Sequence, residues 1–194
     1  MNLKKLFFAA VIVLSANASF AQDTNEATHT VAIKIAEVAL LDLEFAAGAS
    51  TDIILEGTAP SEAGKPMTFG DAATNSDIWI NYSSIVSGTS TRNVKVSITD
   101  GTVPAGLKLT VLAAEDAGNG EGTVGTANGS AITLSGTAQE IVTGVGSAYT
   151  EDGANNGHKL TYQLDYATSA AINYADLKFD NSDTVTITYT LSEI

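Results

Sequence analysis

The sequence predicts an all-β protein, an antiparallel β-sandwich of immunoglobulin-like or jelly-roll type with about nine to ten short strands. The first observation is period-two alternation, clearest at residues 184–191, where apolar residues occupy every odd position and threonine every even one. The second is the turn chemistry between such runs, as at Asp100-Gly101. The third is that no stretch combines sustained 3.6-residue periodicity with helix caps; residues 167–177 offer only a short helical turn.

Each predicted strand has one apolar face, as expected for sheets with one solvated side. The first strand is expected within residues 28–35 and the second at 41–45. The others are expected at 53–55, 78–82, 94–98, 107–111, 132–134, 141–145, 160–166 and 184–191. Two glycine-rich segments, 46–70 and 117–136, interrupt the pattern and are expected to be long connections, the second of them mobile or functional.

Residues 1–21 are expected to form a secretory signal peptide. Lys4 and Lys5 precede an apolar run at 6–14, and Ser19 and Ala21 provide small side chains before the expected cleavage site. The run is too short to span a bilayer, and no later apolar stretch is long enough to insert into one. We therefore expect a single β-sandwich domain, residues 22–194, in an extracytoplasmic location: secreted, on the cell surface or in the periplasm. A secreted chain without cysteine favours a bacterial envelope.

The composition argues against several classes of function. The chain has 22 acidic and 9 basic residues, a formal net charge of −13, which disfavours nucleic acid as a partner. It has no cysteine, hence no thiol nucleophile and no thiolate metal site. The two histidines, His29 and His158, are expected in polar loops, and no Gly-x-Ser-x-Gly elbow is present. We therefore expect a protein that is not an enzyme and needs no cofactor.

Two acidic loops, at residues 116–121 and 151–156, contain the oxygen ligands that calcium prefers. An EF-hand loop places acids at positions one, three, five and twelve. Counting from Asp116 or from Asp152, glycine or alanine occupies position three, so neither loop matches. We predict no metal site, with an irregular calcium site as the remaining alternative to ordinary turn chemistry.

The only tryptophan allows two interpretations. Alternation over residues 77–82 places Trp79 on the opposite face from Ile78, Ile80 and Tyr82. The favoured interpretation makes Trp79 a buried anchor between the sheets, with a bulge that shifts the phase. The alternative leaves Trp79 exposed as a sugar-stacking platform, with Tyr82 and Tyr149 completing a carbohydrate-binding site.

The alternating segments at the two ends of the expected domain are the main functional clue. A terminal strand can pair within its own sheet, or it can be donated to the sheet edge of another subunit. If the N-terminal segment is donated, Val31, Ile33 and Ile35 form the docking row. Self-pairing is the more ordinary outcome.

Two short motifs resemble those of surface proteins. Residues 30–35 (Thr-Val-Ala-Ile-Lys-Ile), followed by 41–45 (Leu-Asp-Leu-Glu-Phe) and a Gly/Ser turn, resemble the start of secreted fimbrial and spore-coat-type β-sandwich subunits. Tyr162-Gln-Leu164 and Tyr189-Thr-Leu191 are similar in placement to the paired Trp-x-Leu motifs of cell-wall-binding domains. Tyrosine replaces both tryptophans here, so wall binding does not carry over.

Both resemblances imply a non-enzymatic β-sandwich exposed on the cell envelope. We therefore expect an exported structural or adhesive subunit whose partners are copies of itself or other surface proteins. Glycan binding through the exposed aromatic is the alternative function.

Overall fold

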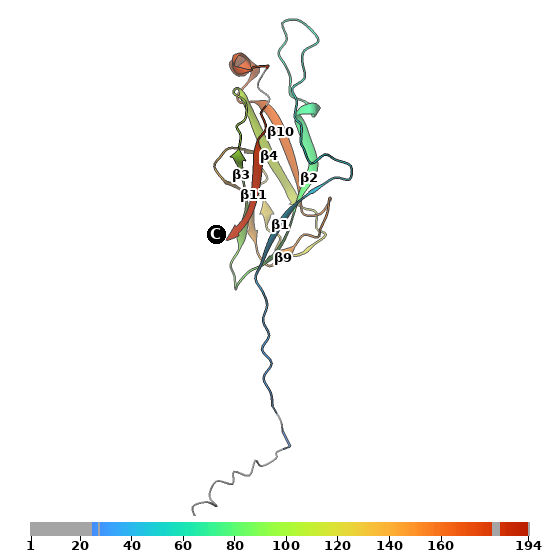
Figure 1. Ribbon diagram of the computed structural model, residues 1–194, viewed down its shortest axis with the longest axis vertical. Coiled ribbons are helices and arrows are strands. Elements are labelled where there is room, and N and C mark those ends of the chain that lie inside the picture. The colour runs from blue at the N-terminus through green and yellow to red at the C-terminus, as the bar shows by residue number, and fades with distance from the viewer. Residues whose placement is uncertain (1–24, 27, 180–182, 194) are drawn as a thin grey trace, which may run out of the picture. The chain divides into compact units, whose positions relative to one another are not determined.

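A computed structural model describes residues 25–26, 28–179 and 183–193 of the chain (Figure 1). The predicted signal peptide therefore lies outside the described residues. The contacts between Cα atoms divide the chain into two units, one ending at Ile35 and the other comprising Ala36–Ile194. In the first unit, residues 28–35 belong to no helix or strand, so the strand expected there is not formed within the chain.

The second unit is an all-β sandwich, which confirms the predicted fold class. Its larger sheet has seven antiparallel strands in the order β5-β9-β2-β10-β4-β7, with β1 paired to the other edge of β2. These strands are β1 (Val38–Phe45), β2 (Thr74–Ile85), β4 (Leu107–Asp116), β5 (Glu121–Gly122), β7 (Ile132–Thr133), β9 (Ala148–Tyr149) and β10 (His158–Tyr166).

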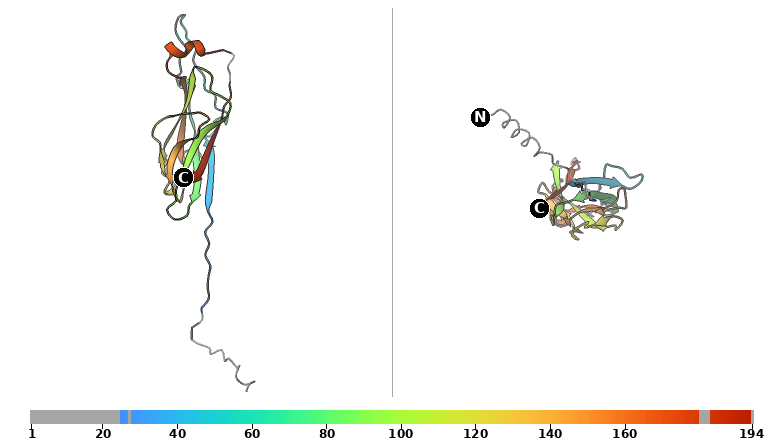
Figure 2. Two further views of the ribbon diagram at one scale, coloured as in Figure 1. Left: turned by 90° about the vertical axis from the view of Figure 1, so that its left-hand side faces the viewer. Right: turned by 90° about the horizontal axis from the view of Figure 1, so that it is seen from below.

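The smaller sheet has four antiparallel strands in the order β11-β3-β8-β6. They are β3 (Arg92–Asp100), β6 (Thr126–Ala127), β8 (Gln139–Val145) and β11 (Thr186–Glu193). The two sheets pack face to face, as Figures 1 and 2 show. Of the strands in the described residues, the last, β11, thus forms one edge of the smaller sheet, and the first, β1, one edge of the larger.

The core lies between the inward-facing side chains of the two sheets. It includes Ile78, Ile80 and Tyr82 of β2, Val94 and Val96 of β3, Val111 of β4, Ile141 and Val142 of β8, and Leu160 and Tyr162 of β10. Except for the adjacent Ile141 and Val142 of β8, these residues follow the two-residue period of a strand, because successive side chains of a strand point to opposite faces. The alternation in the sequence therefore predicted most of these inward-facing apolar residues correctly. The two sheets are also joined by tyrosines: the hydroxyl oxygens of Tyr162 in β10 and Tyr189 in β11 lie 2.6 Å apart.

The non-strand segments differ from expectation at two places. Residues 53–55 form no strand, although Ile53 and Leu55 pack against the core. The segment 117–136 is not one long connection, since it contains β5, β6 and β7. Three short helices complete the described residues: η1 (Asp71–Ala73), α2 (Ala170–Asn173) and η2 (Tyr174–Asp176). The last two fall where the sequence allowed a helical turn.

Gly157 shows why a glycine is needed just before β10. Its φ is +62°, in the left-handed region, and an added Cβ atom would lie 2.0 Å from the carbonyl oxygen of Ile80. A side chain there would collide with the backbone of β2, so only glycine permits this approach of the loop to the sheet.

Candidate functional site

The predicted docking row is fully accessible. Val31, Ile33 and Ile35 expose 69%, 85% and 80% of their surface. Single exposed apolar residues are common, but three in alternation on one unpaired segment make an apolar strip. This strip has the side-chain pattern of a strand, and no strand pairing involves it in the described part of the chain.

Among the described residues, the sandwich has two long edges without a neighbouring strand, and both belong to terminal strands. β1 pairs only with β2, and β11 pairs only with β3. The two strands run beside each other on one side of the sandwich (Figure 1). We call this the terminal-strand side. On the opposite side, the sheets end in β6 and β7, each two residues long in the structure. Short edges resist further pairing, whereas eight-residue edges can extend a sheet.

The core is incompletely covered on the terminal-strand side. Apart from Tyr189, which is buried, the inward-facing side chains of β1 and those at and just before β11 are only partly buried: Leu41, Leu43, Phe45, Val185, Ile187 and Leu191. The equivalent side chains on the opposite side, Ile132, Leu134 and Ala127, are buried. Apolar surface therefore remains in contact with water along the two terminal strands.

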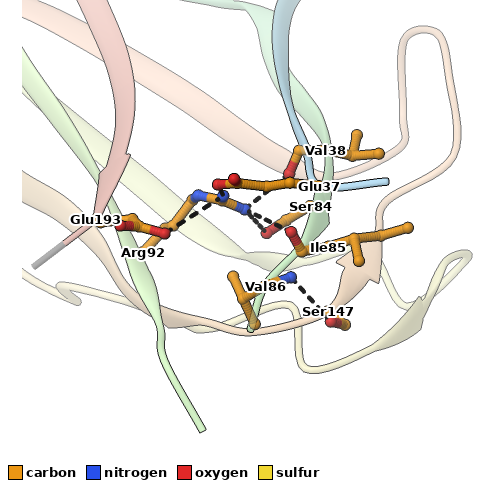
Figure 3. Close-up of polar contacts among 8 residues, drawn as sticks. All are labelled: Glu37, Val38, Ser84, Ile85, Val86, Arg92, Ser147 and Glu193. Atoms are coloured by element: carbon orange, nitrogen blue, oxygen red, sulfur yellow. Dashed lines mark hydrogen bonds and ion pairs between the residues drawn. The ribbon is translucent and has the colours of Figure 1, made fainter. Parts of the chain in front are cut away.

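Arg92 connects the two terminal strands at one end of this side (Figure 3). Its guanidinium comes from the start of β3, and only 2% of the residue is exposed. Nη1 donates to the carbonyl oxygens of Val38 (2.7 Å) and Ile85 (3.2 Å) and to the hydroxyl of Ser84 (2.9 Å). A buried arginine is tolerated only with such full pairing.

The second guanidinium nitrogen of Arg92 binds the residue that precedes β1 and the last residue of β11. Nη2 donates to the carboxylate of Glu37, and Oε1 of Glu193 lies 3.7 Å away (Figure 3). Arg92 thereby anchors the root of the N-terminal segment. Sequence reasoning missed this residue, because a lone arginine at the start of a strand has no pattern that distinguishes it from a solvated one.

Trp79 is buried, with 6% of its surface exposed, so the exposed-platform alternative is wrong. The favoured interpretation is corrected in part, because Trp79 does not belong to the core cluster between the sheets. It keeps the phase of the alternation and lies on the outer face of β2, paired with Lys159 of β10 and Glu44 of β1. The ammonium of Lys159 lies 5.3 Å from the ring centroid, a cation–π distance.

Tyr82 is also withdrawn from solvent. Its hydroxyl donates to the carbonyl oxygen of Val124 and lies 2.8 Å from Nε2 of His158. Burial, with a smaller effect of the Asp116 carboxylate, raises the pKa of Tyr82 above its ordinary value. His158 is fully buried, and its Nδ1 lies 2.9 Å from the carbonyl oxygen of Ala114. The expectation that His158 occupies a polar loop is therefore wrong: it is a core residue at the start of β10.

Tyr149 is the one member of the predicted aromatic trio that solvent reaches, with 43% exposed. It borders a groove of about 530 Å³ on the outer face of the larger sheet. The groove is lined by Leu40, Asp42, Asn81, Ser83, Glu151 and Asp152 as well as by both tyrosines. The side-chain Nδ2 of Asn81 donates to the carbonyl oxygens of Glu151 (2.6 Å) and Gly153 (3.3 Å), while its buried Oδ1 has no partner.

The two acidic loops are held by turn contacts. The backbone N–H of Gly118 donates to Asp116 over 2.7 Å, and Asn119 donates to Asn156 over 2.8 Å, which joins one loop to the other. Among the described residues, no cluster of three or more histidine, aspartate or glutamate side chains is arranged to hold a metal ion. In the same residues, no helix has the length and apolar character needed to cross a bilayer.

Comparison of the chain with protein-family models, curated proteins and solved structures finds no match. The candidate site therefore rests on geometry alone: an exposed apolar strip and a sandwich side with two free edges.

Proposed function

We propose that this protein is an exported structural or adhesive subunit that assembles through its N-terminal segment, residues 28–35. The observation that carries the proposal is the pattern of exposure. Three apolar side chains alternate in an unpaired segment, and the same chain has long sheet edges without a neighbour. Strand addition to a sheet edge accounts for both the unpaired apolar segment and the free edges. In this mode of binding, the backbone provides affinity and the alternating side chains provide specificity.

A comparison of the free energy of apolar burial with the cost of ordering the segment favours strand pairing over apolar contact alone. Full burial of a Val or Ile side chain contributes roughly 1.5–3 kcal/mol. Fixing the backbone of a single residue costs roughly 1–2 kcal/mol, and this cost applies along the whole segment. Three apolar contacts are therefore of the same order as the ordering cost, so main-chain hydrogen bonds at a sheet edge are needed for stable binding.

The acidic character of the chain argues against nucleic acid as a partner. Its net charge of −13 would repel a phosphate backbone. The four-stranded sheet also presents a row of exposed threonines, Thr186, Thr188 and Thr190, on its outer face. Hydroxyl-bearing strands of this kind remain solvated without adding charge.

The test compares the secreted form, residues 22–194, with a form that lacks residues 22–35. We expect the longer form to assemble at high concentration, by light scattering and electron microscopy, and the shorter form to remain monomeric with an unchanged Tm. Ile33→Asp should have the effect of the truncation, whereas Thr30→Asp, which adds the same charge on the other face of the alternation, should leave assembly intact. Assembly that survives the truncation would show that the segment is not the docking element.

A second candidate function, glycan binding, is favoured by the groove beside Tyr149. A partly exposed aromatic ring next to carboxylate and amide oxygens can stack on a sugar and accept hydrogen bonds from its hydroxyl groups. Tyr149→Ala should abolish binding to a glycan array, and Tyr174→Ala is a matched control because Tyr174, 47% exposed, lies in η2 and does not line the groove. An array with no bound glycan, or binding that both variants retain, argues against this function.

A further inference from the structure

The free edge of β1 is long enough to accept the apolar part of the N-terminal segment. β1 (Val38–Phe45) has eight residues, and Val31, Ile33 and Ile35 lie within a stretch of five. The only other free edge of that length in the described residues is β11, since β5, β6 and β7 have two residues each. The possible acceptors are therefore the two strands that bound the terminal-strand side.

The apolar pattern of β1 also matches that of the segment. The inward-facing residues of β1 are Leu41, Leu43 and Phe45, which are partly buried. In an antiparallel pair, directly opposite residues point to the same face. One register places every exposed apolar residue of the segment opposite one of these three: Ile35 with Leu41, Ile33 with Leu43, and Val31 with Phe45. All strand pairs of the described residues are antiparallel.

The same register brings opposite charges together. Lys34 lies on the other face of the segment and is exposed. The outward-facing side chains of β1 include Asp42, which is exposed, and Glu44. Pairing Ile35 with Leu41 necessarily places Lys34 opposite Asp42 and next to Glu44. Cross-strand pairs of opposite charge stabilise a sheet, and like charges destabilise it.

The other long free edge, that of β11, does not offer this charge pattern. Its outward-facing residues are the neutral threonines Thr186, Thr188 and Thr190. Its one carboxylate, Glu193, lies at the far end of the strand, 3.7 Å from the buried guanidinium of Arg92. Charge complementarity therefore favours β1 over β11.

The segment reaches this register on its own β1 only if residues 36–40 form the turn, which would remove Val38, Ala39 and Leu40 from their pairs with β2. A two-residue turn at Ala36-Glu37 would pair Ile35 with Val38, which places the apolar row over the outward-facing residues of β1. Tight hairpins of this kind also prefer residues with positive φ, such as glycine and asparagine. Glu37 is moreover held by Arg92. A second copy of the chain is free of these restrictions.

We propose that β1 of one copy accepts the N-terminal segment of a second copy as an antiparallel strand, in which residues 31–35 lie opposite 41–45 and Lys34 lies opposite Asp42. This inference rests on the proposed function and adds to it the acceptor edge and the register. The incoming Val31, Ile33 and Ile35 cover the partly buried core along the terminal-strand side.

The chain has no cysteine, so introduced cysteines report one contact at a time. We would mix secreted-form protein carrying Ala32→Cys with protein carrying Glu44→Cys, which are opposite in the proposed register. Oxidation should produce a mixed disulfide dimer on a non-reducing gel, because opposite residues have the Cβ separation that a disulfide needs. Mixing Ala32→Cys with Asp42→Cys tests a shifted or parallel register, and Ala32→Cys with Thr188→Cys tests β11.

Each outcome decides the proposal. Cross-linking through Glu44→Cys alone supports it. Preferential cross-linking through Asp42→Cys or Thr188→Cys overturns the register or the acceptor, while leaving assembly through the segment in place. Absence of all three cross-links from protein that still assembles by light scattering overturns the acceptor as well. Protein that does not assemble at all contradicts the proposed function, and the inference fails with it.

Exchanging the charges at Lys34 and Asp42 tests their pairing independently of the cross-linking. Lys34→Glu replaces an attraction with a repulsion, so assembly should weaken about tenfold. Asp42→Lys on the same chain should restore it. Failure of the second substitution to restore assembly would contradict the pairing of Lys34 with Asp42, and the Tm of each variant verifies that the sandwich is intact.

Discussion

Arg92, at the start of β3, donates a hydrogen bond of 2.7 Å to the carbonyl oxygen of Val38, the first residue of β1 (Figure 3). Through this bond and its contact with Glu193, one buried side chain joins the first and last strands of the sandwich. The root of the N-terminal segment is thereby fixed at the end of the terminal-strand side where β11 ends. A segment that serves in assembly needs such an anchor, because a loose root would increase the entropy lost on binding.

Arg92→Leu should destabilise the sandwich by about 3 kcal/mol, since it leaves the hydroxyl of Ser84 and two backbone carbonyls without their donor. Lys65→Leu, at an exposed loop position, is the control and should change stability by less than about 0.5 kcal/mol. Urea unfolding followed by tryptophan fluorescence measures both. Equal midpoints for the two variants would show that the Arg92 contacts contribute nothing.

Trp79 should behave as a buried residue in spectroscopy and in mutagenesis. As the only tryptophan, it should emit at short wavelength in the folded protein and shift to longer wavelength on unfolding. Trp79→Ala should cost roughly 3–5 kcal/mol, the range for truncating a large buried aromatic residue. An emission maximum like that of free tryptophan in the folded state would contradict the burial.

Gly157→Ala should be much more harmful than Gly129→Ala. Both glycines have positive φ, +62° and +72°, so both substitutions meet the same backbone penalty of roughly 1–2 kcal/mol. Only at Gly157 does the new Cβ atom meet the carbonyl oxygen of Ile80, because nothing lies within 4 Å at Gly129. We expect Gly157→Ala to exceed about 3 kcal/mol or to prevent folding. Similar melting temperatures for the two variants would show that the loop before β10 can move away from β2.

The tyrosine pair between the sheets should make the protein sensitive to alkali. Burial raises the pKa of Tyr162 to about 12, and it raises the pKa of Tyr189 well above the ordinary value. Below pH 10, both phenols are neutral in the folded and unfolded states. Between pH 10 and about 12 the unfolded chain loses phenol protons that the folded chain retains, so stability falls as the pH rises, by up to about 1.4 kcal/mol per pH unit for each tyrosine.

Tyr162→Phe should reduce this decline by the share of one tyrosine. Thermal melts at pH 9, 10, 11 and 12 provide the comparison. A decline of equal slope in the wild type and in Tyr162→Phe would assign the alkaline sensitivity to other groups.

Only part of the candidate site could be predicted from the sequence. The row Val31, Ile33 and Ile35 could be recognised, because period-two alternation is a local property of consecutive residues. The role of Arg92 could not, because its partners come from strands that are 7 to 101 residues away along the chain. For the same reason the local sequence predicts a loop at His158, whereas its burial depends on contacts with β2 and β4, which no local pattern records.

The sequence by itself determined the all-β class and the inward-facing residues of most strands, because strand geometry assigns alternate side chains to opposite faces whatever their partners are. It also established that the chain has no disulfide and is strongly acidic. Only the tertiary structure decided which strands became edges, that Trp79 lies buried on an outer face, and that the core is least covered beside β1 and β11. Those properties arise from which strands become neighbours, and strand order depends on contacts between residues far apart in the chain.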